Sequence, residues 1–308
     1  MARYIIKTIT AGILSIFVLA SVTFFLIHAI PGGPFSPAEE RKTPPEVLNI
    51  IAQKYGLNDP IHIQYINYMK NLLHGDFGIS FKRMNYTVNE LIVSGFPVTA
   101  RLGAVAALCS ILIGIPIGII AAVWKDSWAD WLSRIFSTVG VSIPGFVLAV
   151  LMMFYFSVYL KVLPVRGLET PKHYIMPVIA LSLGPIAYIG RLTRSNMLEA
   201  FGQDYIRTAR SKGVREFFVI VKHALKNSLT TVVAYLGPMI IALLTGSFVV
   251  EKIFSIPGIG RSFINGIADR DYSVVLGLTI FFGAMLIFAN IIVDIAYAII
   301  DPRIKFEE

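Results

Sequence analysis

Charged residues are scarce in this chain of 308 residues, and their scarcity excludes an ordinary soluble protein. Only 15% of the residues are charged, whereas a soluble globular domain carries about 25%. Hydrophobic residues make up 56% of the sequence, and the mean hydropathy is +0.70. We therefore expect much of the protein surface to face lipid rather than water.

The sequence has one cysteine and no cluster of metal-ligand residues, which argues against disulfide bonds and metal sites. The single cysteine, Cys109, cannot form an internal disulfide and is expected to be a small buried residue in an apolar run. The five histidines show no metal-ligand spacing; they are His28, His62, His74, His173 and His223. The glycine-rich segment 257–260 lacks the pattern of a phosphate-binding loop. We expect no catalytic residue, metal site or cofactor in this chain.

Long charge-free runs, in contrast, are abundant. A helix needs about 20 apolar residues to cross the hydrocarbon core. Six runs meet or approach this length; they are 9–30, 102–124, 135–160, 174–190, 228–250 and 272–293. The fourth is short and is expected to extend past Arg191. The first is too long for the apolar part of a signal peptide and is expected to be retained. The sequence predicts an all-α polytopic membrane protein with six transmembrane helices.

The distribution of positive charge predicts the orientation of these helices. With a cytoplasmic N-terminus, the inner segments hold fourteen Lys and Arg residues: Arg3, Lys7, Lys125, Arg134, Arg191, Arg194, Arg207, Arg210, Lys212, Arg215, Lys222, Lys226, Arg303 and Lys305. The two short outer loops hold six: Lys161, Arg166, Lys172, Lys252, Arg261 and Arg270. Cytoplasmic loops carry the excess of positive charge, so both termini are expected inside. This bias explains most of the net charge of +8 without a nucleic-acid partner.

These spans divide the chain into four parts. Residues 1–31 form the first helix, 32–95 an extracytoplasmic helical cap, 96–301 a core of five helices, and 302–308 a cytoplasmic tail. Within the cap, Thr43-Pro44-Pro45-Glu46 and Asp59-Pro60 each read as a helix start, and the second helix is expected to end at Gly75. The cap either braces the bundle or helps to seat a protein that delivers the substrate.

The inner loop at about 191–227 is the most informative segment. Asp204 is expected to cap a short helix, and Gly213 to end it in a left-handed conformation. A second amphipathic helix then leads into the fifth span. On composition alone, this cationic helix–turn–helix could equally be a loop that touches anionic lipid.

The loop resembles the cytoplasmic EAA loop of ABC-importer permeases, in the variant typical of the peptide/nickel branch. Arg207-Thr208-Ala209 stand where E-A-A is usual, Gly213 stands at the glycine, and His223-Ala224-Leu225-Lys226 stand near the end. Asn227 occupies the place of the branch's proline. Three further segments resemble this branch: 75–80 with its Gly-Asp-Phe-Gly and Ser80, 251–272, and 294–303. The likeness covers essentially the whole chain and is nearest to the B-type oligopeptide subunit.

The resemblance implies a type I importer permease that hydrolyses no ATP itself. The expected ATPase-coupling residues are Tyr205, Arg207, Thr208, Ala209, Arg210, Lys212, Gly213 and His223. The expected partners are a second, C-type permease in a heterodimer, two ATPase subunits that bind ATP and Mg²⁺, an extracytoplasmic peptide-binding protein, and the lipid of the cell membrane. The substrate could be an oligopeptide, a dipeptide or nickel, and the substrate-contacting residues are not identified.

Several intramembrane features accompany this reading. Gly114 and Gly118 form a helix-packing motif. Proline is expected to break helices at Pro144-Gly145, Pro177, Pro185 and Pro238. Asp294 is expected to pair with a loop arginine, and Thr99 and Arg101 to stand at the outer start of the second span.

Two other classes of membrane protein make different demands on the sequence. A secondary transporter would need paired intramembrane carboxylates, and an intramembrane enzyme would need a clustered catalytic set. Asp294 alone comes near the first requirement, and no catalytic set is visible in the sequence.

Overall fold

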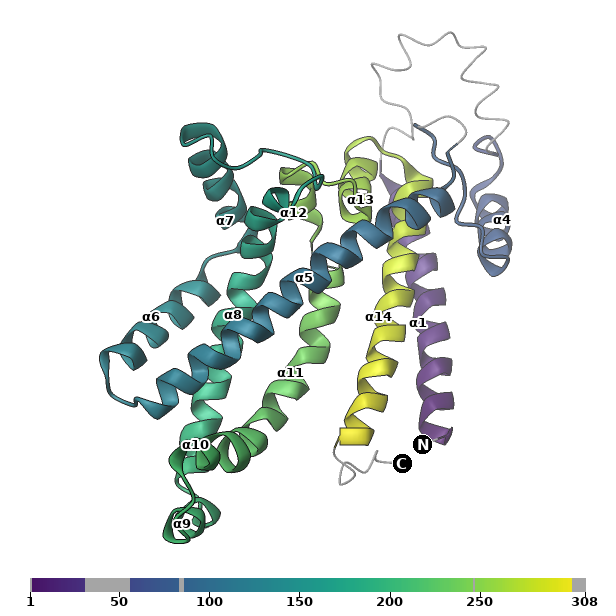
Figure 1. The fold of residues 1–308 in the computed structure, drawn as a ribbon. Helices are drawn as coiled ribbons and strands as arrows, with labels where there is room; N and C mark the ends of the chain where they lie inside the picture. Colours follow the sequence, from purple (N-terminus) through teal and green to yellow (C-terminus); the bar gives the residue numbers. More distant parts are fainter. Residues whose placement is uncertain (1, 31–55, 83–85, 246, 301–308) are drawn as a thin grey trace. The chain divides into compact units, whose positions relative to one another are not determined.

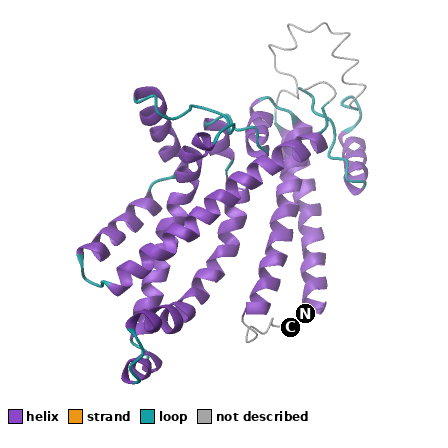
Figure 2. Ribbon diagram, viewed as in Figure 1, coloured by secondary structure: helices purple, strands orange, loops and turns teal. Residues whose placement is uncertain are grey.

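The computed structural model describes residues 2–30, 56–82, 86–245 and 247–300, with side chains outside 2–7, 245 and 294–300. These residues form helices joined by loops (Figure 2). A lone β-bridge pairs Ile79 with Thr87 within the described ranges. The chain divides into two compact units, Met1–Val98 with Pro257–Glu308, and Thr99–Ile256. The expected start of a helix at Thr43 lies outside the described residues.

The first unit is built on two long antiparallel helices, α1 (Ala2–Ala29) and α14 (Tyr272–Ile300), which pack side by side (Figure 1). The first residues of α1 lie at the same end as the last residues of α14 (Figure 1). Phe24 and Ile27 of α1 bury their side chains against Tyr272 and Leu276 of α14. The unit also holds α4 (Ile61–Leu73) and α13 (Ile259–Ala268).

Helix α4 forms where the sequence predicted the second cap helix. Pro60 stands at its N-cap position, where its missing N–H group leaves no backbone donor unpaired. The helix is followed by Gly75 at a φ of +75°, in the left-handed region expected of a glycine after a helix. The prediction of this helix is confirmed.

The second unit contains most of the remaining helices. It takes up the later part of α5 (Val88–Val123), then α6 (Trp128–Ser142), α7 (Gly145–Met152) and the π-helix η1 (Met153–Tyr159). The long α8 (Pro171–Phe201) follows, then α9 (Asp204–Ser211), α10 (Glu216–Phe218) and the π-helix η2 (Val219–Leu225). The unit ends with α11 (Lys226–Thr245) and α12 (Phe248–Ile253).

Helix α5 packs closely on α8 because it presents glycine at the contact. A Cβ atom at Gly118 would lie 2.5 Å from the carbonyl oxygen of Gly190, and one at Gly114 would lie 2.9 Å from Ile189 Cβ. Small residues let two helix backbones approach closely in a membrane. The prediction that Gly114 and Gly118 form a packing motif is confirmed.

Five segments of the described chain are long and apolar enough to cross a membrane: Thr8–Ala29, Val88–Val123, Pro171–Phe201, Glu216–Ile253 and Tyr272–Val293. The pair Trp128–Ser142 and Gly145–Tyr159 gives a sixth, bent by 97°. The six-span prediction is therefore recovered, with the third span broken at Pro144-Gly145 as expected. The fourth extends past Arg191, as expected.

The break in the third span has a local cause. Ile143 is extended, with φ −86° and ψ 118°, and closes α6. A proline disfavours the helical region for the residue before it, and Ile143 takes the extended conformation, so α6 ends there and α7 begins after Pro144. In contrast, Pro177, Pro185 and Pro238 lie inside continuous helices. The expectation that these three prolines break their helices is wrong.

Two further positions differ from expectation. Helix α5 begins at Val88, so the cap boundary at residue 95 falls inside a helix, and Thr99 and Arg101 lie well beyond its start. Thr99 is buried, and its hydroxyl donates to Glu251 Oε1 at 2.8 Å. Cys109 is half-buried rather than fully buried. The side chain of Asp294 lies outside the described residues, so its pairing stays a prediction.

Candidate ATPase-coupling loop

Helix α9 projects from the end of the second unit that is opposite α7 and α12 (Figure 1). The preceding helix, α8, has 31 residues and is therefore about 46 Å long, whereas the hydrocarbon core is about 30 Å thick. Helix α9 follows directly after the C-terminal end of α8. It lies between two segments that are long and apolar enough to cross a membrane, Pro171–Phe201 and Glu216–Ile253, and belongs to neither.

One face of α9 anchors it to the bundle. Ile206 and Ala209 are buried, and they stand three residues apart on the same face of the helix. They pack with Met197 of α8, and with Val219 and Ala224 of η2. Apolar burial of this kind fixes the helix to the end of α8 and to η2. The side chain of Ala209 thus supports α9 and does not face a partner.

The opposite face of α9 is polar and exposed. Tyr205 is 39% exposed. The other predicted coupling residues of the helix and its C-terminal turn are exposed as well: Arg207, Thr208, Arg210, Lys212 and Gly213. The exposed surface holds three cations, of which Arg207 lies 3.8 Å from Asp204 and Arg210 pairs with Glu216. Four cations and two carboxylates leave segment 204–216 with a net positive charge, so an acidic surface would complement it. We name this surface, formed by Tyr205, Arg207, Thr208, Arg210 and Lys212, the α9 face.

The turn after α9 depends on glycine. Gly213 has a φ of +75°, a conformation that costs other residues conformational energy. Its N–H group donates to the Arg210 carbonyl oxygen at 2.9 Å, and the N–H group of Val214 donates to Ala209 at 3.2 Å. These bonds satisfy carbonyl groups at the end of the helix. The prediction that Gly213 ends the helix in a left-handed conformation is confirmed.

An ion pair closes this turn. Arg210 donates to Glu216 through Nη2 at 2.5 Å and through Nε at 3.2 Å, so the contact is bidentate. Hydrogen bonding to Glu216 raises the pKa of the Arg210 guanidinium above its ordinary value. Bidentate pairs fix geometry better than single contacts. Glu216 was not among the predicted residues. The sequence places it six residues after Arg210, on the other side of the turn at Gly213, and this spacing was the only signal for the ion pair.

The loop re-enters the bundle through a widened helix. The π-helix η2 contains His223, whose side chain is half-buried. The side-chain amide of Asn227 donates to the His223 carbonyl oxygen at 3.2 Å. Asn227 therefore lies within the helix that begins at Lys226, and the chain enters α11 without a proline. The expected second helix is confirmed, with a π-helical turn that the sequence did not indicate.

A buried ion pair stands two helical turns before the end of α8. Arg194 donates to Asp130 of α6 through Nε at 2.5 Å and Nη2 at 2.8 Å. The side chain of Asp130 is 0% exposed and that of Arg194 is 20% exposed. A second cation, Arg134, has its Nε atom 3.7 Å from Asp130 Oδ1. In the sequence, Arg134 and Arg194 were counted only among the inner positive charges, and Asp130 was not singled out. The pair ties α6 to the helix that carries α9.

A polar recess of about 320 Å³ adjoins the base of α9. Tyr205 lines it together with amide, hydroxyl and carboxylate side chains: Asn196, Glu199, Gln203, Asn227, Ser228 and Thr231. The amide of Asn196 donates to the Ser228 carbonyl oxygen at 3.2 Å, which links α8 to α11 beside the recess. The recess therefore lies next to the α9 face and shares Tyr205 with it.

Two of the outer segments singled out in the sequence meet in the first unit. The Asp271 carboxylate accepts hydrogen bonds from the Ser80 hydroxyl and from the N–H group of Phe81, the latter at 3.1 Å. Asp271 is buried and stands directly before α14. The contact fastens segment 75–82 to the start of the last span.

The structure adds one buried carboxylate that sequence analysis placed only within an outer loop. Glu251 of α12 is 0% exposed and accepts from Thr99 at 2.8 Å and from Ser247 at 2.6 Å. Among the described residues, no group of three or more His, Cys, Asp or Glu side chains could hold a metal ion.

Comparison with solved structures identifies the fold. A chain of the MetNI methionine ABC transporter, in an inward-facing conformation, matches with a TM-score of 0.55 at 19% identity, over 68% of this chain and 96% of that chain. A chain of an amino acid ABC transporter matches with the same TM-score at 17% identity, over 68% of this chain and 94% of the other. The expected type I importer permease fold is confirmed.

Sequence comparison identifies the family. The chain is 46% identical to the oligopeptide transport system permease protein OppB of Salmonella typhimurium, over 99% of this chain and 100% of the relative. It is 44% identical to the dipeptide transport system permease protein DppB of Bacillus subtilis, over 100% of this chain and 99% of the relative. Family models match residues 114–306, as a binding-protein-dependent transport system inner membrane component, and residues 1–103, as the N-terminal part of such a component. The chain therefore belongs to the binding-protein-dependent transport system inner membrane components, and it is a permease subunit of an ABC importer rather than an enzyme.

Proposed function

We propose that this permease subunit forms half of a translocation path for peptides and is driven through the α9 face by a separate ATPase. The observation that carries the proposal is the two-sided character of α9. Its buried face is fixed to α8 and η2, while its exposed face offers cations and a tyrosine beyond the membrane-spanning part. A helix held in this way moves together with the ends of α8 and α11, so it transmits a displacement imposed by a partner.

The proposed ligand is an oligopeptide, because relatives at similar identity over their full length carry out oligopeptide or dipeptide transport. A dipeptide or nickel importer of the same branch is the alternative. The delivered substrate is expected to depend on the extracytoplasmic binding protein. ATP and Mg²⁺ are proposed to bind the ATPase subunits, and we propose no cofactor for this chain.

The proposed assembly contains a second, C-type permease in a heterodimer with this chain, two ATPases and a peptide-binding protein on the side of α4. Both termini are proposed to be cytoplasmic. The antiparallel pairing of α1 and α14 supports this arrangement, because it brings the N-terminal end of α1 and the C-terminal end of α14 to the same side of the first unit (Figure 1). The excess of Lys and Arg in the inner segments, the α9 segment among them, supports the cytoplasmic assignment of that side.

Purification of the tagged chain tests the proposal. It should copurify with one related permease and two ATPase subunits, and proteoliposomes of that complex should accumulate a tripeptide only with ATP and the binding protein. A homogeneous preparation that accumulated the peptide on an ion gradient alone would contradict the proposal. In that case the chain would work as a secondary transporter.

A further inference from the structure

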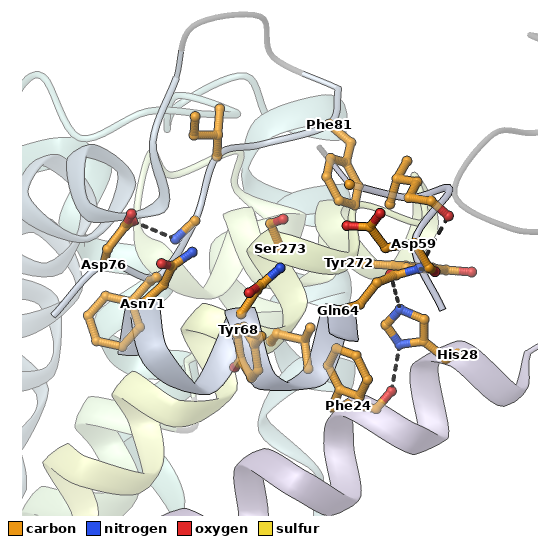
Figure 3. Close-up of a pocket in the computed structure, with 17 residues that line it drawn as sticks. Phe24, His28, Asp59, Gln64, Tyr68, Asn71, Asp76, Phe81, Tyr272 and Ser273 are labelled. Carbon is orange, nitrogen blue, oxygen red and sulfur yellow. Dashed lines mark hydrogen bonds between the residues drawn. The ribbon is translucent and has the colours of Figure 1, made fainter. Parts of the chain in front are cut away.

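The first unit contains a cavity of about 250 Å³ that the transport mechanism above does not use. It lies between the end of α1, helix α4, the segment after α4 and the start of α14 (Figure 3). Five aromatic rings contribute to its wall: Phe24, Tyr68, Phe77, Phe81 and Tyr272. A volume of this size accommodates a group about as large as one amino-acid residue. Concave aromatic walls with a few polar groups are typical of ligand sites.

One face of α4 supplies a row of amide side chains to this cavity. Gln64, Asn67 and Asn71 all line it, at spacings of three and four residues that place them on one side of the helix. Gln64 is held by bonds to the backbone of Leu57 and Asp59. Within the described part of the chain, the side chains of Asn67 and Asn71 form no hydrogen bond. An amide has both donors and an acceptor, so two free amides suit a peptide group.

Carboxylates stand at both ends of this row. The carbonyl oxygen of Asp59 accepts from Gln64, and the N–H group of Asp76 donates to the carbonyl oxygen of Asn71. Residues 64 and 71 are about 10 Å apart along the helix axis, at 1.5 Å per residue. The Asp76 carboxylate accepts from the N–H group of Gly78 at 2.8 Å, whereas that of Asp59 has no partner among the described residues. Asp59 is therefore the carboxylate available to a ligand.

The charge of the cavity is negative. Asp59 and Asp76 line it, and no Lys or Arg stands among the described residues of its wall. Burial raises the pKa of the Tyr68 hydroxyl, so this phenol stays neutral. A ligand cation would gain both the carboxylate and the faces of the aromatic rings, which attract cations.

We propose that this cavity binds the amino-terminal residue of a short peptide. Asp59 receives the ammonium group, Asn67 and Asn71 hydrogen-bond the first peptide group, and the aromatic wall contacts the first side chain. The site is separate from the α9 face and gives the permease an affinity of its own for peptides, apart from that of the binding protein. The identity of the ligand rests on the proposed function, since peptides are the solute proposed for the importer.

The test uses the complete importer complex in nanodiscs of phosphatidylglycerol, whose headgroup carries no amine, without the binding protein. Tritiated Ala-Phe-Ala and its N-acetylated form are the probes, and scintillation proximity measures their binding. The free-amine peptide should bind wild type. Acetylation, Asp59→Asn or the double change Asn67→Ala with Asn71→Ala should each weaken binding at least about tenfold, the effect of losing one charge-assisted hydrogen bond or a comparable pair.

Asp269→Asn is the matched control, because it removes an exposed carboxylate of the same unit that does not line this cavity. It should leave binding within about twofold of wild type, given that surface changes away from a site have small effects. Equal binding of both probes to wild type, or equal affinity in the Asp59→Asn and Asp269→Asn complexes, would overturn the inference. ATP-driven uptake by the wild-type complex with its binding protein, measured in parallel, tests the proposed function separately.

Discussion

Replacing Gly213 by valine should disconnect the ATPase from the bundle without unfolding the protein. A Cβ atom at this position would meet no heavy atom within 4 Å outside the two neighbouring residues, so the site is open around an added side chain. The penalty comes from the backbone alone, because φ is +75° there. The left-handed conformation costs an L-residue about 1–2 kcal/mol, and a β-branched residue lies at the upper end of that range.

This penalty sets the expected effect on coupling. A destabilisation of about 1–2 kcal/mol lowers the population of a conformation about 5- to 30-fold. The affinity for the ATPase falls in proportion to the population of the competent turn. Because the turn is exposed, the penalty does not disturb the buried contacts of Ile206 and Ala209. The thermal midpoint of the complex should therefore change little.

The control is Gly213→Asn, because asparagine adopts the left-handed conformation at little expense. Peptide uptake into proteoliposomes, divided by the ATP hydrolysed, measures coupling. The valine variant should fall about 5- to 30-fold, and the asparagine variant should stay within about twofold of wild type. Equal coupling in the two variants would show that the left-handed conformation of residue 213 does not determine how α9 contacts the ATPase.

Three further changes test other contacts by thermal unfolding. Asp130→Asn breaks the buried pair with Arg194 and should destabilise the second unit by about 3 kcal/mol, at the low end for buried pairs because Arg194 keeps 20% exposure; an unchanged midpoint would contradict this. Glu216→Gln removes the exposed ion pair with Arg210 and should lower the free energy of unfolding by about 0.5–1 kcal/mol. A loss above about 3 kcal/mol would contradict this, because it would mean that the ion pair stabilises more than the turn after α9. Asp271→Asn weakens the contact with segment 75–82 and should cost about 2 kcal/mol, and a neutral result would show that this segment is held by packing alone.

The sequence predicted the spans well because a membrane imposes a simple requirement on length and charge. Charge-free runs marked all six spans, and the excess of inner cations in the α9 segment marked the loop. The bend at Pro144 was foreseen as a break, but its 97° angle depends on how α6 and α7 pack on α8. Pro177 and Pro185 were misjudged: α8 continues through both, and it packs against α6 and α11.

The candidate site was predicted as a segment but not as a surface. The spacing of Ile206 and Ala209 implied a shared face, yet only packing against Met197 and Val219 shows that this face points into the bundle. The Arg210–Glu216 and Asp130–Arg194 pairs join residues across a turn or between helices. Local sequence patterns do not contain such pairings. The start of α5 was missed because Glu90 and Arg101 interrupt its apolar run.

Cysteine cross-linking measures the contact between the α9 face and the ATPase most directly. In a chain freed of its only cysteine by Cys109→Ala, Thr208→Cys places a thiol on the α9 face, and Glu169→Cys places one on the exposed loop before α8. With 4-(N-maleimido)benzophenone attached to the thiol and ultraviolet irradiation of the assembled complex, the cysteine at 208 should form a covalent adduct with the ATPase subunit, and the cysteine at 169 should form none. Equal labelling at both positions, or no adduct from position 208 in a complex that still hydrolyses ATP during uptake, would contradict docking through α9.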